Sequence, residues 1–293
     1  MRAEDAHLAP RRVGLAVKLS SPEAIALGRE ILGELARRKV EGVADAESAG
    51  VLGVAAGPVR AELGRHVDAV VVLGGDGTFL SAARGCPSKT PVAGVNMGTL
   101  GFLTEHSREQ AFALLDELLA GRAVVERRER LRVAVGDGAP GQEFLVLNDV
   151  VINKAALARI LTINVEIEGE FISRYHADGL IVATPTGSTA YNLSAGGPIV
   201  HPRLAAMVIT PICSHTLTNR PLVVPLEWRV RVWLGPGDEE VYLTLDGQLG
   251  LPVAAGDHVE IVRAAEPLSL IRVPTASFFS ILHQKLKWGE REG

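Results

Sequence analysis

One stretch constrains the fold of this chain more than any other: an apolar run at residues 70–73 leads directly into the glycine-rich turn at residues 74–78. Four β-forming residues in a row predict a strand that is buried on both faces, as in the parallel sheets of α/β proteins. Gly74, Gly75 and Gly77 have no Cβ, so we expect the turn to adopt positive φ and to bring backbone N–H groups close to a phosphate. The stretch therefore predicts a phosphate-binding turn at the end of a central strand.

Asp76 is the unusual residue of this turn, because a carboxylate beside a phosphate is repelled unless it binds a metal ion or accepts a proton. Phosphoryl transfer is one interpretation. The other is structural, with Asp76 forming an Asx turn or capping the helix expected from Thr78. A dinucleotide fingerprint is a weaker interpretation, because the pattern from Gly75 lacks the third glycine. The turn alone does not decide between chemistry and structure.

The composition excludes several classes of partner. The 293 residues carry a net charge of −4, so we expect neither nucleic acid nor an anionic membrane as a partner. The first residues lack the pattern of a signal peptide, and no apolar run is long enough to span a bilayer, which predicts a cytoplasmic protein. Cys86 and Cys213 lie far apart in the sequence, which predicts two reduced thiols rather than a disulfide or a zinc site.

The organisation of the chain changes near residue 121. Before it, strand and helix patterns alternate, which predicts a doubly wound α/β domain over residues 1–125. After it, strand patterns follow one another, which predicts a mainly β domain over residues 126–274. The segment 275–293 has the apolar spacing of an amphipathic helix, and we expect it to pack back on the first domain.

The densest polar stretch is residues 178–198. A buried strand leads into a turn rich in hydroxyl side chains, and a short helix is expected from Ser188. N-capping by Ser188 and Thr189, and packing of Tyr191, are the structural alternatives. Five serine and threonine hydroxyls between residues 184 and 194 are more than a cap requires, which favours a site for a polar ligand.

Asn148 and Asp149 interrupt an apolar strand that is expected over residues 144–153. Strand interiors disfavour both residue types, and a buried polar side chain is costly unless it has a partner. The pair is therefore a second candidate for ligand contact.

Together these motifs resemble the NAD kinases, the enzymes that phosphorylate NAD to NADP. The similarity combines the glycine turn, Asn148-Asp149, residues 178–198 and Arg220-Pro221-Leu222-Val223, in order and spacing across residues 70–248. The glycine turn alone is not specific, because diacylglycerol and sphingosine kinases and phosphofructokinases carry similar turns. The resemblance implies an α/β Rossmann-like N-terminal domain, a mainly β C-terminal domain, and an active site in the crevice between them.

The resemblance also implies roles for single residues. Asp76 would be the general base that takes the proton of the adenosine ribose 2′-hydroxyl as this oxygen attacks the γ-phosphate of ATP. A divalent ion, Mg²⁺, would arrive with ATP rather than in a protein cage. NAD and ATP or polyphosphate would be the substrates of a homodimer or homotetramer. The implied dinucleotide contacts are Gly75, Gly77, Asn148, Asp149, Arg159, His176, Asp178, Thr189, Ala190, Tyr191, Asn192, Leu193, Ser194 and Gln248.

Some alternatives stay open at this point. Arg159 could be a surface cation, and His176, which stands where the family often has arginine, could be an ordinary strand histidine. A lipid kinase would share the glycine turn, but the hydroxyl-rich block and the lack of a basic amphipathic surface argue against it. A non-catalytic dinucleotide sensor is the other alternative, and Asp76 argues against it, because binding alone gains nothing from a carboxylate beside a phosphate.

Overall fold

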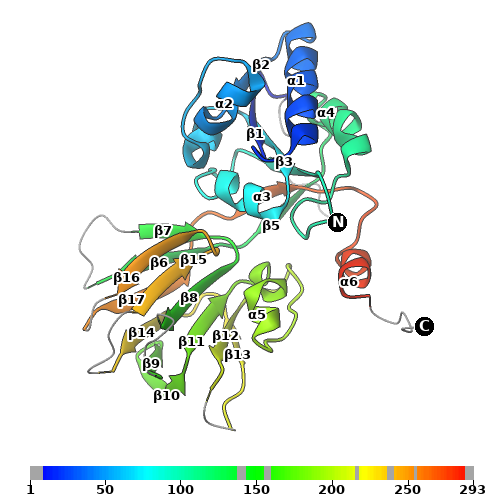
Figure 1. Cartoon of the computed structure of the whole chain (residues 1–293). Coiled ribbons are helices and arrows are strands. Elements are labelled where there is room, and N and C mark those ends of the chain that lie inside the picture. The colour runs from blue at the N-terminus through cyan, green and yellow to red at the C-terminus, as the bar shows by residue number, and fades with distance from the viewer. Residues whose placement is uncertain are drawn as a thin grey trace. The chain divides into compact units, whose positions relative to one another are not determined.

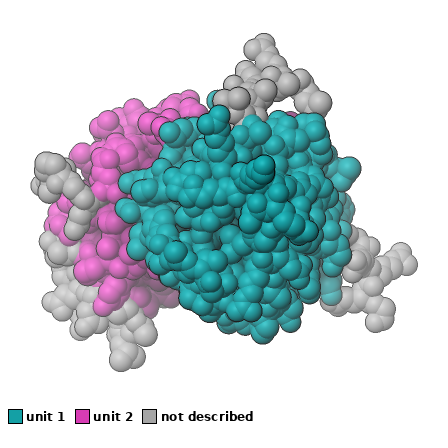
Figure 2. Space-filling view, turned by 90° about the horizontal axis from the view of Figure 1, so that it is seen from above, with its two compact units in different colours: residues 1–127, 268–293 teal, residues 128–267 magenta. Residues whose placement is uncertain are grey.

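The computed structural model describes residues 9–136, 143–154, 160–214, 218–235, 241–253 and 256–287. The chain forms two compact units, one of residues 1–127 and 268–293 and the other of residues 128–267 (Figure 2). In the described part of the chain, no helix is long and apolar enough to cross a membrane.

Unit 1 is built on a six-stranded sheet in the order β2-β1-β3-β4-β18-β5 (Figure 1). Strands β1 to β4 and β18 pair in parallel, which confirms the predicted α/β class. All six residues of β3 are buried, as expected for a strand covered on both faces. The strands are β1 (Arg12–Val17), β2 (Glu41–Ala44), β3 (Ala69–Gly74), β4 (Val92–Asn96), β5 (Val125–Arg128) and β18 (Leu268–Ile271).

Helices cover both faces of this sheet. On one face, buried side chains of α1, α2 and α4 form a single cluster with alternate residues of β1, β3 and β4. On the other face, Leu63 of η1 lies against Gly14 of β1, and α3 packs beside η1 and β3. The helices are α1 (Pro22–Arg37), α2 (Ala46–Leu52), η1 (Arg60–Arg65), α3 (Asp76–Ala83), η2 (Arg108–Gln110), α4 (Ala111–Leu119) and α6 (Phe278–Leu286).

Strand β18 belongs to unit 1, although residues up to 274 were expected in the second domain. It pairs in parallel with β4 and lies between β4 and β5 in the sheet. All four of its residues are buried. A short apolar segment fits either kind of sheet, and only pairing with strands far away in the sequence decides which one it joins.

Unit 2 is a β-sandwich of two six-stranded sheets, β10-β9-β14-β17-β6-β7 and β13-β12-β11-β8-β15-β16. The printed pairings in both sheets are antiparallel, and the core between the sheets takes alternate residues from each. The elements are β6 (Leu131–Val135), β7 (Glu143–Val146), β8 (Asp149–Lys154), β9 (Leu161–Ile167), β10 (Glu170–Ala177), β11 (Gly179–Ala183), η3 (Gly187–Thr189), α5 (Tyr191–Ser194), β12 (Ala206–Ile212), β13 (Leu222–Pro225), β14 (Val230–Leu234), β15 (Val241–Leu245), β16 (Leu249–Val253) and β17 (His258–Arg263).

The single strand expected over residues 144–153 is wrong in one respect, because the chain breaks at Leu147 and Asn148 and changes sheet there. Strand β7 pairs with β6, whereas β8 pairs with β11 and β15 in the other sheet. The carboxylate of Asp246 accepts the backbone N–H groups of Leu147 and Asn148 at 3.1 and 2.6 Å, so these groups bond to a side chain instead of a strand. Asn148 and Asp149 therefore stand at a crossing between sheets and not inside a strand.

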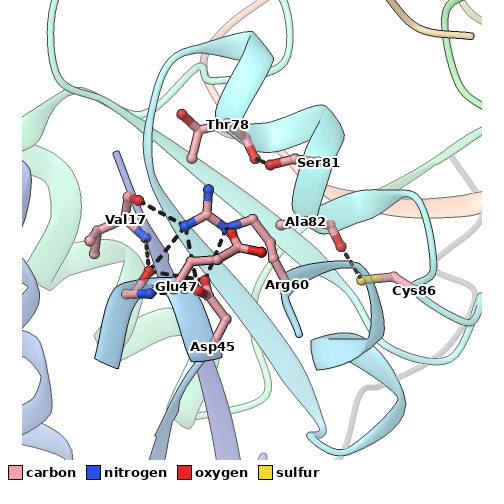
Figure 3. Close-up of polar contacts among 9 residues, drawn as sticks. Val17, Asp45, Glu47, Arg60, Thr78, Ser81, Ala82 and Cys86 are labelled. Carbon is pink, nitrogen blue, oxygen red and sulfur yellow. Dashed lines mark hydrogen bonds and ion pairs between the residues drawn. The ribbon is translucent and has the colours of Figure 1, made fainter. Parts of the chain in front are cut away.

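A buried ion-pair network ties the carboxyl end of β1 to the segment that follows β2 (Figure 3). The Arg60 guanidinium contacts Asp45 and Glu47 at 3.1 and 2.9 Å, and it donates to the carbonyl oxygen of Val17 at 3.1 Å. Asp45, which is fully buried, also caps α2 by accepting the N–H of Ser48 at 2.8 Å. These bonds fix the edge of the sheet from which the glycine turn starts.

Candidate functional site

Asp76 is the first residue of α3, directly after β3, and its side chain is half-buried. Its carboxylate does not cap the helix. Instead, Oδ2 accepts the N–H of Phe102 at 2.8 Å, and Oδ1 accepts the N–H groups of Leu103 and Thr104, each at 3.1 Å. The hydroxyl of Thr104 donates to Oδ1 as well, at 3.0 Å. The carboxylate thus binds the loop that follows β4, which neither interpretation of the sequence anticipated.

The two carboxylate oxygens of Asp76 accept different numbers of hydrogen bonds. A carboxylate oxygen has two lone pairs, and Oδ1 already accepts three hydrogen bonds. Oδ2 accepts only the N–H of Phe102 among the described residues. Oδ2 is therefore the oxygen that can accept a further hydrogen bond or a proton.

The glycine turn differs from the expectation of positive φ. Gly74, Gly75 and Gly77 are absent from the described glycines with positive φ, and Gly75 is extended, with φ −104° and ψ −175°. Gly74 is required for a different reason, because a Cβ there would lie 2.7 Å from the Thr78 hydroxyl. A Cβ at Gly75 or Gly77 would meet nothing within 4 Å, so the backbone of both borders open space.

The loop between β4 and η2 holds the Asp76 carboxylate, and the sequence analysis left this loop without a role. Asn96 donates to the carbonyl of Thr99 at 2.6 Å and accepts the N–H of Gly98 at 2.6 Å, so its side chain shapes the loop from within. Gly101 lies so close to Asp76 that a Cβ there would come within 2.0 Å of Oδ1. The signal in the sequence was a second glycine-containing turn after the next strand, residues 97–103.

Unit 2 holds a pocket of about 370 Å³, a volume within the range of small-molecule sites. Four of the predicted dinucleotide contacts line it, from the start of β8 and the residues around α5. Its lining consists of Asn148, Asp149, Val151, Asn153, Ala190, Tyr191, Thr244, Asp246 and Gly247.

Asp246 is the acidic residue of this pocket that the sequence analysis did not name as a contact. It is buried, with φ +52°, at the tight turn between β15 and β16. Its Oδ1 accepts the N–H groups of Asn148 and Asp149 at 2.6 and 3.3 Å, and both oxygens accept that of Leu147. Such a set of backbone donors stabilises the charged carboxylate. The Asp-Gly pair before Gln248 was the available signal.

Asp149 lies next to Asp246, but its environment disfavours the charged form of its carboxyl group. Burial raises the pKa of Asp149 to about 7, and the nearby carboxylate of Asp246 adds to the rise. A hydrogen bond from the backbone N–H of Tyr191 opposes both effects. At neutral pH Asp149 is therefore partly protonated, so its carboxyl group can both donate and accept hydrogen bonds in the pocket.

The segment expected to form one short helix consists of two turns, η3 and α5, separated by Ala190 with ψ −131°. Gly196 ends the second turn with φ +83°. Asn192 is fully buried, and its side-chain amide bonds to other protein groups. The amide nitrogen donates to the carbonyl oxygens of Ser188 and Pro198 at 3.0 and 3.1 Å, and the amide oxygen accepts the Thr210 hydroxyl at 2.7 Å.

The other predicted contacts of this segment differ in exposure and partners. Thr189 is half-buried and donates to the Thr186 carbonyl at 3.2 Å. Leu193 is half-buried and Ser194 is exposed. Tyr191 is 45% exposed and lines the pocket. The Tyr191 ring is therefore the large side chain of this segment that a ligand in the pocket can contact.

The remaining predicted contacts do not line this pocket. His176 is exposed on β10, and its Nδ1 lies 3.5 Å from the Thr162 hydroxyl. Asp178, at the junction of β10 and β11, pairs with Lys154 at 2.8 Å. Gln248 is exposed in the turn after Asp246, and Arg159 lies outside the described residues.

Comparison with protein families covers most of the chain. Residues 13–123 match the ATP-NAD kinase N-terminal domain, and residues 147–273 match the ATP-NAD kinase C-terminal domain. Among curated proteins, the NAD kinase of Geobacter sulfurreducens is 45% identical over 96% of this chain and 100% of its own length. That of Syntrophobacter fumaroxidans is 47% identical over 96% of this chain and 99% of its own length.

Two solved structures are similar over nearly the whole chain. Yeast NADH kinase complexed with NADH superposes with a TM-score of 0.87 at 26% identity, covering 96% of this chain and 89% of that one. An NAD kinase from Archaeoglobus fulgidus in complex with ATP has a TM-score of 0.76 at 26% identity, covering 95% of this chain and 100% of that one.

Proposed function

Since this chain belongs to the NAD kinase family, we propose that it transfers the γ-phosphate of ATP to the 2′-hydroxyl of the adenosine ribose of NAD, giving NADP. The observation that supports this most directly is the pocket of unit 2, which gathers Asn148, Asp149 and Tyr191 around one hollow. The two similar structures, which are complexes with NADH and with ATP, support a dinucleotide and a nucleoside triphosphate as the ligands.

We assign the dinucleotide to this pocket. Hydroxyl groups of a ribose need both donors and acceptors, and the Asn148 amide with the partly protonated Asp149 carboxyl offers both. The exposed Tyr191 ring offers an apolar face to a ribose or a base. The buried amide of Asn192 holds the turn in shape, so its contribution to binding is to position Tyr191.

Asp76 is assigned the role of general base. The remaining lone pair on Oδ2 would take the proton of the 2′-hydroxyl as this oxygen attacks phosphorus, while the bond from phosphorus to the leaving β-phosphate oxygen breaks. The three N–H groups of residues 102–104 hold the carboxylate in one orientation, which supplies positioning at no cost during the reaction. Gly75 and Gly77, whose backbones border open space, leave room beside it for a phosphate.

Mg²⁺ is assigned to the phosphates of ATP. Mg²⁺ usually keeps several waters and is bound through substrate phosphates and one or two carboxylates, which supports its arrival with ATP. The same proposal includes polyphosphate as the alternative phosphoryl donor to ATP. It also includes a homodimeric or homotetrameric state and a cytoplasmic location.

The test is a coupled assay with NAD, Mg-ATP and an NADP-specific dehydrogenase. The Asp76→Asn variant should lose a hundredfold or more in turnover number, with the Michaelis constant for NAD nearly unchanged. Because the amide also disturbs the loop, Thr104→Val is the control: it removes one hydrogen bond to Oδ1 and should stay within about tenfold of wild-type turnover.

Three results would contradict this proposal. No NADP from the wild-type protein would favour the non-catalytic sensor. Equal losses of turnover in Asp76→Asn and Thr104→Val would reduce Asp76 to a support of the loop. Full turnover in excess chelator would exclude Mg-ATP as the donor.

A further inference from the structure

A larger cavity, of about 1010 Å³, lies wholly within unit 1 and has no part in the proposed reaction. The residues that line it stand immediately before strands β1, β3 and β4, after α1, and at the end of α4. It therefore opens at the amino-terminal edge of the parallel sheet. The glycine turn and Asp76 follow the carboxyl end of β3, so the six residues of this strand, about 17 Å of chain, separate the two places.

Four cationic side chains line the cavity, one from each of the four segments that lead into strands β1 to β4. Arg11 precedes β1, Lys39 precedes β2, Arg65 stands before β3, and Lys89 before β4. All four residues are exposed, and their side chains make no ion pair or hydrogen bond with the residues that the structure describes. A chain with a net charge of −4 thus gathers four unpaired positive charges around one hollow.

The other charged residues of the cavity do not neutralise these cations. Arg12 is paired with Glu41 at 2.9 Å. Among the described residues that line the cavity, Asp68 is the only carboxylate, and its Oδ2 accepts the backbone N–H groups of Arg11 and Arg12 at 2.8 and 2.9 Å. His66 also lines the cavity. The excess of positive charge therefore remains available to a ligand.

The arrangement of the cations indicates the shape of the ligand. The strand order β2-β1-β3-β4 brings the segments that carry Lys39, Arg11, Arg65 and Lys89 to the starts of four neighbouring strands. Neighbouring strands lie about 4.8 Å apart, so this row of strand starts spans about 14 Å. A row of this length matches a ligand with several phosphates rather than a single phosphate ion.

The wall behind the cations is apolar, with Val67, Ala69, Pro91 and Leu118 all buried in the lining. Small-molecule sites combine such apolar walls with a few charged groups. We propose that this cavity is a second binding site, for an organic polyphosphate of nucleotide size, with the phosphates on the four cations and the nucleoside part on the apolar wall. The concave shape and the overall negative charge favour this ligand over nucleic acid.

The test is isothermal titration calorimetry on the full chain in metal-free buffer, with two probes: inorganic tripolyphosphate and GTP. The double variant Lys39→Glu, Lys89→Glu should bind both probes at least tenfold more weakly than the wild-type protein. The control Lys285→Glu, Lys287→Glu makes the same change in net charge on exposed residues of α6 and its cap, outside the cavity, and should bind as the wild type does. The charge-preserving variant Lys39→Arg, Lys89→Arg should retain binding.

The outcomes separate this proposal from the proposed function. Thermal unfolding and turnover without added probe check that each variant folds, and both should be unchanged. If both Glu double variants bind the probes more weakly by the same factor, or if neither binds them more weakly than the wild type, the proposed binding site is excluded. GTP binding no more tightly than tripolyphosphate would overturn the role of the apolar wall. Because binding is measured directly, each result stands whatever the coupled assay shows.

Discussion

At the scale of single residues, the proposed site has two carboxyl groups, those of Asp149 and Asp246, in different environments. Asp246 accepts backbone N–H groups from three residues, which favours its charged form. Asp149 is buried beside it, and the pKa of Asp149 rises to about 7. A carboxyl group that is partly protonated at neutral pH can donate as well as accept hydrogen bonds. The pair therefore suits a ligand rich in hydroxyl groups.

This environment makes stability depend on pH with a definite sign. The folded protein keeps a proton on Asp149 between the ordinary pKa of 3.8 and about 7, whereas the unfolded chain releases it. The free energy of unfolding therefore falls as pH rises through this window and levels off above it, by about 4 kcal/mol at most. Asp149→Asn should remove this loss. We expect the variant to be more stable than the wild type at pH 8, and by a smaller margin at pH 5.

Chemical denaturation at the two pH values measures the effect. Asp116→Asn changes a carboxylate whose side chain is 54% exposed and should leave the pH dependence unchanged. A margin for Asp149→Asn that is the same at pH 5 and pH 8 would contradict the raised pKa.

Tyr191 tests the assignment of the dinucleotide to unit 2. Its ring is exposed and lines the pocket, so Tyr191→Ala should raise the Michaelis constant for NAD about tenfold, in line with the cost of losing an aromatic contact to a base or sugar. The constant for ATP should change less. Tyr191→Phe keeps the ring and should stay close to wild type, and Phe171→Ala removes an exposed ring outside the pocket. Equal effects at Tyr191 and Phe171 would remove Tyr191 from the site.

At the scale of elements, the loop after β4 and the start of α3 act as one structure. Asp76 accepts three backbone N–H groups of residues 102–104, and Gly101 allows the loop to approach it. Hydrogen bonds to a charged acceptor are each worth about 1.5–3 kcal/mol, so the contact fixes both the loop and the carboxylate.

Two glycines of this loop offer a matched test. A Cβ at Gly101 would come within 2.0 Å of Asp76 Oδ1 and 2.3 Å of the Thr104 hydroxyl, whereas a Cβ at Gly98 would meet nothing within 4 Å. Gly101→Ala should therefore lower both the unfolding temperature and the turnover number, by tenfold or more, while Gly98→Ala changes little. Thermal unfolding and the coupled assay measure the two effects. An active, stable Gly101→Ala protein would show that neither folding nor turnover requires the close contact between the loop and Asp76.

The elements also show which features the sequence alone could predict. Strand β3, buried on both faces, follows from a local pattern, and the structure has it. The break at Leu147 depends on Asp246, which lies 99 residues away, and no local pattern reports it. The partners of Asp76 are likewise 26 to 28 residues away. Residue types and spacing predicted which side chains matter, but long-range hydrogen bonds decided what each one contacts.

At the scale of the whole molecule, the two largest hydrophobic cores among the described residues have no residue in common. One lies within unit 1 and includes Ile271 of β18, and the other lies within the sandwich of unit 2. Unit 2 is one continuous segment, residues 128–267, whereas unit 1 needs two segments. Cores of this kind predict independent folding, since each unit buries its own apolar surface.

The difference between the units can be tested with fragments. Residues 128–267 should fold cooperatively, because their core and the pocket between Asn148 and Gly247 lie within the fragment, and the fragment should bind NAD by calorimetry. Residues 1–127 alone should not fold stably, because they lack β18, which stands between β4 and β5 in the sheet. Joining residues 1–127 to 268–293 through a short glycine-serine linker restores that strand and should restore cooperative unfolding. A folded fragment of unit 2 that fails to bind NAD would contradict the assignment of the dinucleotide to that pocket, and stable folding of residues 1–127 would show that β18 is dispensable to the parallel sheet.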